Sequence, residues 1–335
     1  MKLFPSALLA LATALPVVLT AALGSPGAYA ASTPFPGKPV RIVIPFAAGQ
    51  GSDILARAIG ERLTKAWGQP VVVENRAGAN GAIALQDVAR SAPDGYTILL
   101  TSNSPIVINP SLYKKLPYDV GRDFVPVALL AATDMVMVVN DKFPARNLQE
   151  VIAELNAHPD KYSYGSPGTG STSHLSMEVF KRTAGVKITH VPYKGSAPAF
   201  TDLIGGSTQL MIDAMPSALP QVKGGRVRAI AITSSDVPST IAPDIPTASS
   251  AGVSGLPERP WYGVFAPRAT DPDIVAKVRQ DLLAAMTSPE IHGRMAELGL
   301  ESVPPLSAAE FAAFLKEHTD YWNQATQKIG MYQTE

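Results

Sequence analysis

The stretch VRIVIPFAAGQGSDILARAIGERL, residues 40–63, decides the fold class of this chain. It begins with a β-branched run, residues 40–45, which predicts a buried strand. A loop of small residues follows, and apolar residues then recur at helical spacing, at Ile54, Leu55, Ala58, Ile59 and Leu63. A second β-branched run, residues 71–73, comes after that helix. Strand, loop, helix and strand in this order predict an α/β protein with a parallel sheet.

The same alternation continues along the chain. Further strands are predicted at residues 96–100, 135–139, 162–164, 186–190, 210–213, 227–232 and 261–265. Further helices are predicted at 81–91, 147–157, 174–183, 197–205, 216–223, 271–287, 289–298 and 308–328. Two α/β blocks therefore lie on either side of about residue 133. Residues 243–260 are dense in Pro, Gly, Ser and Ala and predict a loop or hinge before the last strand.

These blocks predict two lobes. We expect lobe I to comprise residues 31–133 plus 258–335, with the C-terminal helices returning to it, and lobe II to comprise residues 134–257. A hinge is expected near residues 130–135 and 256–262.

The composition excludes several classes of protein. Lys and Arg number 28, Asp and Glu number 28, and there is no Cys in the 335 residues. Zero net charge argues against a nucleic-acid partner. The lack of Cys excludes disulfide scaffolds, thiol nucleophiles and zinc sites built on Cys.

The first thirty residues predict a secretory signal peptide. Lys2 precedes an apolar run from Leu3 to about Leu23, and Ala28-Tyr-Ala30 is a cleavage site of the A-x-A kind. The alternative is an uncleaved membrane anchor, because the run is nearly long enough to span a bilayer. Two prolines within the run and the A-x-A site favour cleavage near Ala30, and export argues against enzymes that use cytosolic nucleotide cofactors.

Polar loops of small residues follow several predicted strands, at 46–53, 101–104, 165–173, 191–196 and 213–216. Ligands of open α/β sheets bind at these carboxyl ends. Residues 165–173 have the glycine spacing of a phosphate loop without its Lys, and the alternative is an ordinary helix-capping loop. Residues 46–53 resemble a dinucleotide fingerprint, but Ile54 occupies the third glycine position, and Asp53 is predicted to be an N-cap. We expect no cofactor.

Catalytic and metal arrangements are not predicted. Ser171, Ser173 and His174 cluster, with Asp202 and Asp213 downstream, but no G-x-S-x-G elbow is present. The histidines show no metal-ligand spacing. Four aromatic residues at strand ends, Phe46, Tyr193, Trp261 and Tyr262, either belong to the core or flank a ligand.

Many blocks of sequence, taken together, resemble one family. They include residues 38–49 (KPVRIVIPFAAG), 68–78 (GQPVVVENRAG), 93–97 (PDGYT), 118–126 (YDVGRDFVP), 165–170 (GSPGTG), 190–195 (HVPYKG) and 261–263 (WYG). The resemblance is to the Bug-type periplasmic solute-binding proteins of tripartite tricarboxylate transporters, and it covers nearly all of residues 36–330.

The resemblance implies a two-lobed, type II "Venus flytrap" fold in the periplasm that closes on a small organic carboxylate and delivers it to membrane subunits of the transporter. It implies no catalytic activity. The family holds the carboxylate with loop amides, hydroxyls and waters. By position, the candidate ligand-binding residues are Phe46, Ala48, Gly49, Gln50, Ser52, Ser102, Asn103, Ser166, Thr169, Gly170, Ser171, Tyr193 and Asp213.

Gln50 departs from the family's first loop, which often reads P-A-G-G-x-x-D, and it either reaches the ligand or points to solvent. The alternatives are an orphan subunit that serves a sensor kinase and a secreted enzyme, which would need a nucleophile and base across the cleft. We expect a monomer. Dicarboxylates, tricarboxylates, acidic amino acids and aromatic acids all stay open as ligands.

Overall fold

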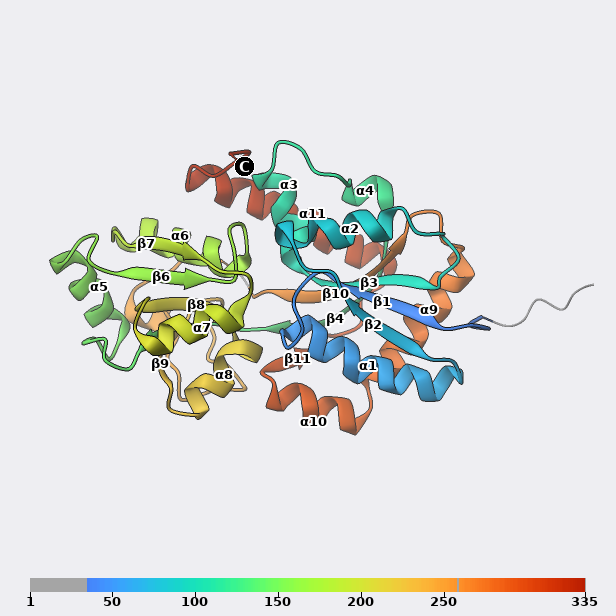
Figure 1. Ribbon diagram of the computed structural model, residues 1–335, viewed down its shortest axis with the longest axis horizontal. Helices are drawn as coiled ribbons and strands as arrows, with labels where there is room; N and C mark the ends of the chain where they lie inside the picture. The colour runs from blue at the N-terminus through green and yellow to red at the C-terminus, as the bar shows by residue number, and fades with distance from the viewer. Residues whose placement is uncertain (1–34, 258, 335) are drawn as a thin grey trace, which may run out of the picture. The chain divides into compact units, whose positions relative to one another are not determined.

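Two mixed β-sheets organise the residues that the computed structural model describes, 35–257 and 259–334 (Figure 1). The first sheet has the order β11-β4-β10-β3-β1-β2, with β1 (Val40–Ile44), β2 (Val71–Asn75), β3 (Thr97–Ser102), β4 (Phe124–Thr133), β10 (Trp261–Pro267) and β11 (Leu300–Ser302). The second has the order β7-β6-β8-β5-β9, with β5 (Met135–Asn140), β6 (Ser163–Ser166), β7 (Thr189–Pro192), β8 (Leu210–Ala214) and β9 (Val227–Ile232). The predicted signal peptide lies outside the described residues.

Helices cover both faces of each sheet (Figure 1). On the first sheet, α1 (Gly51–Trp67), α9 (Pro272–Met286) and α10 (Pro289–Glu297) lie on one face, and α2 (Ala82–Ala89), the π-helix η2 (Ser104–Ile108), α3 (Asn109–Leu112) and α11 (Ala308–Lys328) lie on the other. On the second sheet, α5 (Leu148–Ala157) and α6 (Thr172–Ala184) lie opposite α7 (Ser196–Gly205) and α8 (Met215–Lys223). Three short helices, η1 (Ala79–Gly81), α4 (Val120–Asp123) and η3 (Ser249–Ala251), lie in connections.

The alternation of side chains along each strand explains these layers. In β1, Ile42 and Ile44 pack in the cluster that contains α1, whereas Val43 packs on the opposite face with α2. In β5, Met135, Met137 and Val139 face α5 and α6, whereas Val136 and Val138 face α7 and α8. Successive strand side chains point to opposite faces, so a strand buried on both faces is apolar throughout.

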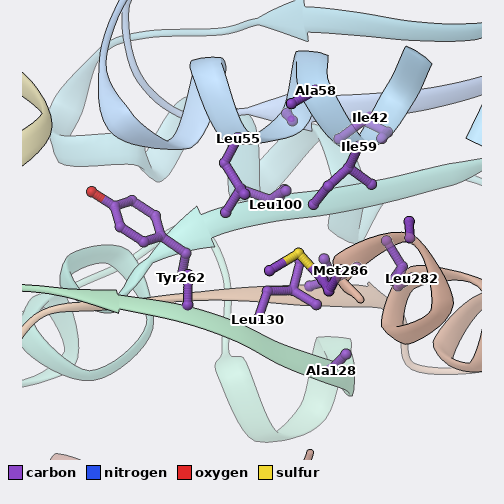
Figure 2. Packing of buried hydrophobic residues seen from close by; sticks show 14 of the residues in the cluster. Ile42, Leu55, Ala58, Ile59, Leu100, Ala128, Leu130, Tyr262, Leu282 and Met286 are labelled. Atoms are coloured by element: carbon purple, nitrogen blue, oxygen red, sulfur yellow. The ribbon is translucent and has the colours of Figure 1, made fainter. Parts of the chain in front are cut away.

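The apolar stripe predicted in residues 54–63 forms part of the core of the first lobe. Figure 2 shows Leu55 and Ile59 of α1 packed near Leu100 and Leu130 of the sheet, with Leu282 of α9 nearby. Tyr262 lies at the margin of this cluster with its hydroxyl directed away from the apolar side chains. The core therefore holds the Tyr262 ring at the edge of the lobe.

The predicted two-lobed α/β class is confirmed, with corrections in detail. Strands β1, β2 and β3 are parallel, as the first segment predicts. Strand β10 pairs antiparallel with both β3 and β4, and β11 pairs antiparallel with β4, so the prediction of a parallel sheet is wrong there. Strands β4 and β11 were not predicted. Pro126 and the alanines of β4 weaken its strand pattern, and its pairing with β10 contains two register shifts. Strand β7 begins at Thr189, three residues later than predicted.

The chain passes between the sheets at Asp134, the single residue between β4 and β5. The buried carboxylate of Asp134 pairs with Arg259, on the segment that leads back to β10, at 2.9 Å between Oδ1 and Nε. Arg259 also pairs with Glu301 at 2.6 Å. The Thr133 amide donates to the Pro260 carbonyl. These contacts join the two crossing segments; the lobe boundaries at 133/134 and 257/258 stay a prediction.

Replacing Arg259 with Met should lower the free energy of unfolding by about 3 kcal/mol, because it leaves the buried Asp134 carboxylate without its cation. This value is at the lower end of the usual loss of stability when a buried ion pair is broken, because the Arg259 side chain is 32% exposed. Urea unfolding measures the change. The double variant Asp134→Asn/Arg259→Met should recover most of the loss, and a single variant as stable as the wild type would contradict a role for the ion pair.

Candidate functional site

A cavity of about 620 Å³ is lined by residues of both lobes. The first lobe and the crossing segments contribute Pro45, Phe46, Ala47, Gln50, Gly51, Ser52, Ala77, Gly78, Ala79, Asn80, Gly81, Ser102, Asn103, Ser104, Tyr113, Pro260 and Tyr262. The second lobe contributes Met135, Pro167, Gly168, Thr169, Ser171, Thr172, Ser173, Tyr193, Lys194, Gly195, Ser196, Asp213, Ala214 and Ser217. These residues follow the carboxyl ends of β1, β2, β3, β6, β7 and β8, where ligands of open sheets bind.

Most of the predicted site residues lie in this cavity wall: Phe46, Gln50, Ser52, Ser102, Asn103, Thr169, Ser171, Tyr193 and Asp213. Four predicted residues, Ala48, Gly49, Ser166 and Gly170, are not part of the wall. Ala48 and Gly49 are exposed, whereas Ser166 and Gly170 are buried behind the wall. The structure thus brings the predicted loops together, and some of their residues support the wall without forming it.

The Asp53 side chain holds the first loop, residues 46–50, in place. The N-cap of α1 is Gln50, so the prediction of Asp53 as the N-cap is wrong; Asp53 lies in the first helical turn. Its carboxylate accepts hydrogen bonds from the Gly49 amide at 2.9 Å and from Asn75 Nδ2 at 3.0 Å. Although burial acts to raise the pKa of Asp53, these bonds and the Arg57 guanidinium hold it below its usual value. Asp53 is therefore an ionised anchor for residues 46–50.

The glycine-rich loop of lobe II is held by its own side chains. The Gly168 amide donates to Ser166 Oγ, and the Gly170 amide donates to His174 Nδ1 at 3.1 Å. The amides of Gly168 and Gly170 therefore already have partners within the lobe. The N-cap of α6 is Ser171, whose Oγ accepts from the His174 amide.

Residues 77–81 (AGANG) line the cavity and were missed as site residues. Their backbone has positive φ at four consecutive positions, 133° at Gly78, 46° at Ala79, 45° at Asn80 and 88° at Gly81. Asn and Gly tolerate this region far better than other residues. Two glycines and an asparagine directly after a strand were the signal that would have indicated a tight polar turn at the same sheet edge.

Hydrogen bonds cross between the lobes beside the cavity. Asn80 Nδ2 donates to the Gly170 carbonyl at 2.8 Å, and Ser104 Oγ donates to the same carbonyl at 3.2 Å. Thr172 Oγ1 donates to Asn103 Oδ1 at 3.1 Å. Asn80 also bonds to Asn109 Oδ1 at 2.7 Å, which holds its side chain in place. These contacts hold the two lobes in a closed arrangement.

Close packing between the lobes constrains Gly51, the first residue of α1. A Cβ atom there would overlap the Tyr262 hydroxyl and lie 3.1 Å from Cγ of Pro216 in lobe II. Gln50 also approaches lobe II, because a Cβ at Gly195 would lie 3.1 Å from Gln50 Nε2. Gln50 therefore lies at the junction of the lobes and in the cavity wall.

The wall carries little formal charge. Among the described residues that line it, Lys194 is the only one with a basic side chain and Asp213 the only one with a carboxyl group. The other polar side chains are hydroxyls and amides, and helices α1, α6, α7 and α8 begin at or beside the wall. The N-caps of α1, α7 and α8 make no side-chain hydrogen bond to their helices. Helix N-termini and neutral donors suit an anionic group.

Ser166 and His190 form a side-chain hydrogen bond, at 2.7 Å between Oγ and Nε2. Ser166 is fully buried and outside the cavity wall. The His190 ring is stacked with the rings of both Tyr164 and His174, at centroid distances of 4.8 and 4.0 Å. This geometry supports the glycine-rich loop from behind and offers a substrate no access to the serine.

Burial lowers the pKa of both histidines in this stack, to about 3 for His174 and about 4 for His190. The neighbouring His190 lowers the pKa of His174 further. Both rings are therefore neutral near pH 7, which leaves His174 Nδ1 able to accept from Gly170.

Residues 35–257 and 259–334 contain no cluster of His, Asp or Glu that could hold a metal ion. None of their helices is both long enough and apolar enough to cross a membrane.

The two-sheet α/β fold of this chain, with a polar cavity between its lobes, is the fold of the two-lobed solute-binding proteins. Residues 55–331 match the family described as tripartite tricarboxylate transporter family receptor, and the chain belongs to this family. It is 35% identical over 315 residues to protein BugT of Bordetella pertussis, which covers 93% of this chain and 95% of BugT.

Two similar solved structures contain carboxylates. R. palustris Rpa4515 with adipate has a TM-score of 0.84 and 33% identity, and the match covers 88% of this chain and 98% of that one. MatC from Rhodopseudomonas palustris with bound malate has a TM-score of 0.82 and 33% identity, over 87% and 99% of the two chains.

Acid should destabilise this protein through the histidine stack. In the unfolded chain these histidines take up protons near their ordinary pKa of 6.5, whereas in the folded protein they stay neutral to a much lower pH. The unfolded state therefore binds more protons, and stability falls as pH drops from 6.5 to 5. Urea unfolding at these two pH values measures the loss. It should be smaller in His190→Gln, and an equal loss in both proteins would rule the stack out as its cause.

Removing the Asn80 side chain should favour the open arrangement of the lobes. Asn80→Gly keeps a residue that accepts positive φ, and Asn80→Asp keeps the shape but cannot donate to the Gly170 carbonyl. Both variants should show a larger radius of gyration by small-angle X-ray scattering. A radius equal to that of the wild type in both would mean that this bond does not hold the lobes together.

Proposed function

We propose that this receptor works in the periplasm as a monomer, captures a small organic carboxylate by closure of its lobes, and delivers it to the membrane subunits of a tripartite tricarboxylate-type transporter. The observation that carries the proposal is the cavity wall, in which both lobes contribute neutral donors and helix starts. The relatives that contain adipate and malate support the ligand class.

The wall explains how a chain of zero net charge would hold an anion. Hydroxyl groups of Ser52, Ser102 and Thr169 and the amides of Gln50 and Asn103 supply hydrogen bonds without a compensating Arg. Donors in a water-poor site gain strength because the local dielectric is low. We propose these five residues, with Phe46, Ser171, Tyr193 and Asp213, as the ligand-contacting set.

Closure follows from contact with both lobes. A ligand shifts an open–closed equilibrium only by its difference in affinity for the two states. A molecule that bonds to residues 50–52 of lobe I and to residues 169–173 of lobe II has that difference, because both sets face one cavity in the closed arrangement. Capture and release therefore need no bond chemistry, and we propose that the protein is not an enzyme.

A thermal-shift screen of residues 31–335 tests this function. Carboxylates such as malate, adipate, citrate and benzoate should include at least one compound that raises the melting temperature. At a concentration of about 100 times its dissociation constant it should add about 2.7 kcal/mol to the stability. Neutral sugars of similar size are the control. A shift with a sugar and with none of the acids would contradict the proposed ligand class.

The delivery step is tested separately. Purified receptor loaded with the best acid of the screen should be retained by the transporter's membrane subunits and not by a sensor kinase expressed in the same way. Retention by the sensor kinase alone would contradict delivery to a transporter and would indicate that the receptor serves a sensor system.

A further inference from the structure

We propose that Asp213 is a neutral hydrogen-bond donor to the ligand, so that the cavity selects carboxylic acids without an amino group over the matching amino acids. This inference rests on the proposed function and narrows its ligand class. The Asp213 carboxyl group is buried, and only one of its two oxygens has hydrogen-bond partners among the described residues.

Asp213 lies near the end of β8 in the cavity wall, and it is only 3% exposed. Its Oδ1 accepts hydrogen bonds from Ser173 Oγ at 2.8 Å and from the Ala214 amide at 2.9 Å. Its Oδ2 is buried and has no hydrogen-bond partner among the described residues. A buried polar atom without a partner is costly, so Oδ2 is the atom that a ligand in the cavity would satisfy.

No cation of the described residues neutralises this carboxyl group. The elements packed against β8 are β5, β6, α6, α7 and α8. Their titratable side chains are Tyr164, His174, Glu178, Lys181, Arg182, Asp202 and Lys223, and none of these forms an ion pair or hydrogen bond with Asp213. Lys194, the other charged residue of the wall, is exposed and forms no ion pair with it.

Tyr262, which also lines the cavity, is a neutral phenol. Burial raises its pKa, so the Tyr262 hydroxyl keeps its proton near neutral pH. Tyr262 offers no positive charge that would favour an ionised Asp213.

Burial also raises the pKa of Asp213, while the hydroxyls of Ser196 and Ser173 and the Ala214 amide act in the opposite direction. A buried carboxyl group that no cation neutralises holds its proton more readily than an exposed one. Since Ser173 and Ala214 donate to Oδ1, the proton belongs on Oδ2, the oxygen without an acceptor or donor partner.

A protonated Oδ2 recognises an acceptor. A ligand carboxylate or hydroxyl oxygen can accept its proton in a charge-assisted or neutral hydrogen bond. An ammonium group has no lone pair, so beside Oδ2–H it would lose its hydration without a partner. An ionised Asp213 would reverse this preference, because it would attract an ammonium and repel a carboxylate.

Matched pairs of acids separate these two states of Asp213. The probes are succinate and L-aspartate, glutarate and L-glutamate, and adipate and L-2-aminoadipate, each pair differing by one amino group. Isothermal titration at pH 7 gives their dissociation constants. In each pair for which binding is detected, we expect the dissociation constant of the acid without the amino group to be lower by about ten-fold or more.

Two substitutions test the donor directly. Asp213→Asn keeps an acceptor for Ser173 and places an N–H donor at the position of Oδ2, whereas Asp213→Ala removes both. The glutarate affinity of Asp213→Ala should be about ten-fold weaker than that of Asp213→Asn. Asp141→Asn is the control, because it removes a carboxylate that is 76% exposed in the same lobe and outside the wall. Urea unfolding of each variant verifies that it folds.

The outcomes are distinct. Tighter binding of the amino acids, or equal losses in Asp213→Asn and Asp213→Ala, would overturn the neutral donor and leave carboxylate capture standing. Failure of all six probes would also overturn this inference, and the broader screen of carboxylates against sugars would then decide the proposed function by itself.

Discussion

The meeting of the two lobes in one cavity depends on how the chain passes between its two sheets. A single buried residue, Asp134, separates β4 from β5, and Arg259 pairs with it on the returning segment. Because the two crossings are tied together, the loops that follow β1, β2 and β3 meet the loops that follow β6, β7 and β8 in one cavity. Rotation about such short crossings would separate the two walls without disturbing either core, which is how hinge closure works.

The polar character of the site follows from the layered fold. Strands buried on both faces carry mostly apolar side chains, and many of the polar groups lie at strand ends and helix starts. Side chains outside the wall support these ends: the ionised Asp53 holds the first loop, and the neutral His174 and His190 hold the second. The polar groups of the wall itself are hydroxyls, amides, the exposed Lys194 and the Asp213 carboxyl group, whose Oδ2 has no hydrogen-bond partner among the described residues.

Hydrophobic spacing and turn residues predicted the β1–α1–β2 unit, the two α/β lobes and most of the helices. Strand β4 could not be predicted in this way, because its alanines and Pro126 are tolerated through pairing with β10, whose residues lie 129 to 143 positions later in the chain. The antiparallel direction of β10 is likewise set by the return of the chain, which no local pattern encodes. In the site, sequence predicted which loops converge. It could not predict that Gly170 bonds to Asn80 across the lobes, or that Ser166 turns to His190 behind the wall.

The most direct test of the account is a crystal structure of residues 31–335 grown with malate or adipate. The account predicts a carboxylate inside the cavity that hydrogen-bonds both to residues 50–52 and to residues 169–173, with the Asn80–Gly170 bond intact. A ligand bound to one lobe alone, or outside the cavity, would contradict capture by closure.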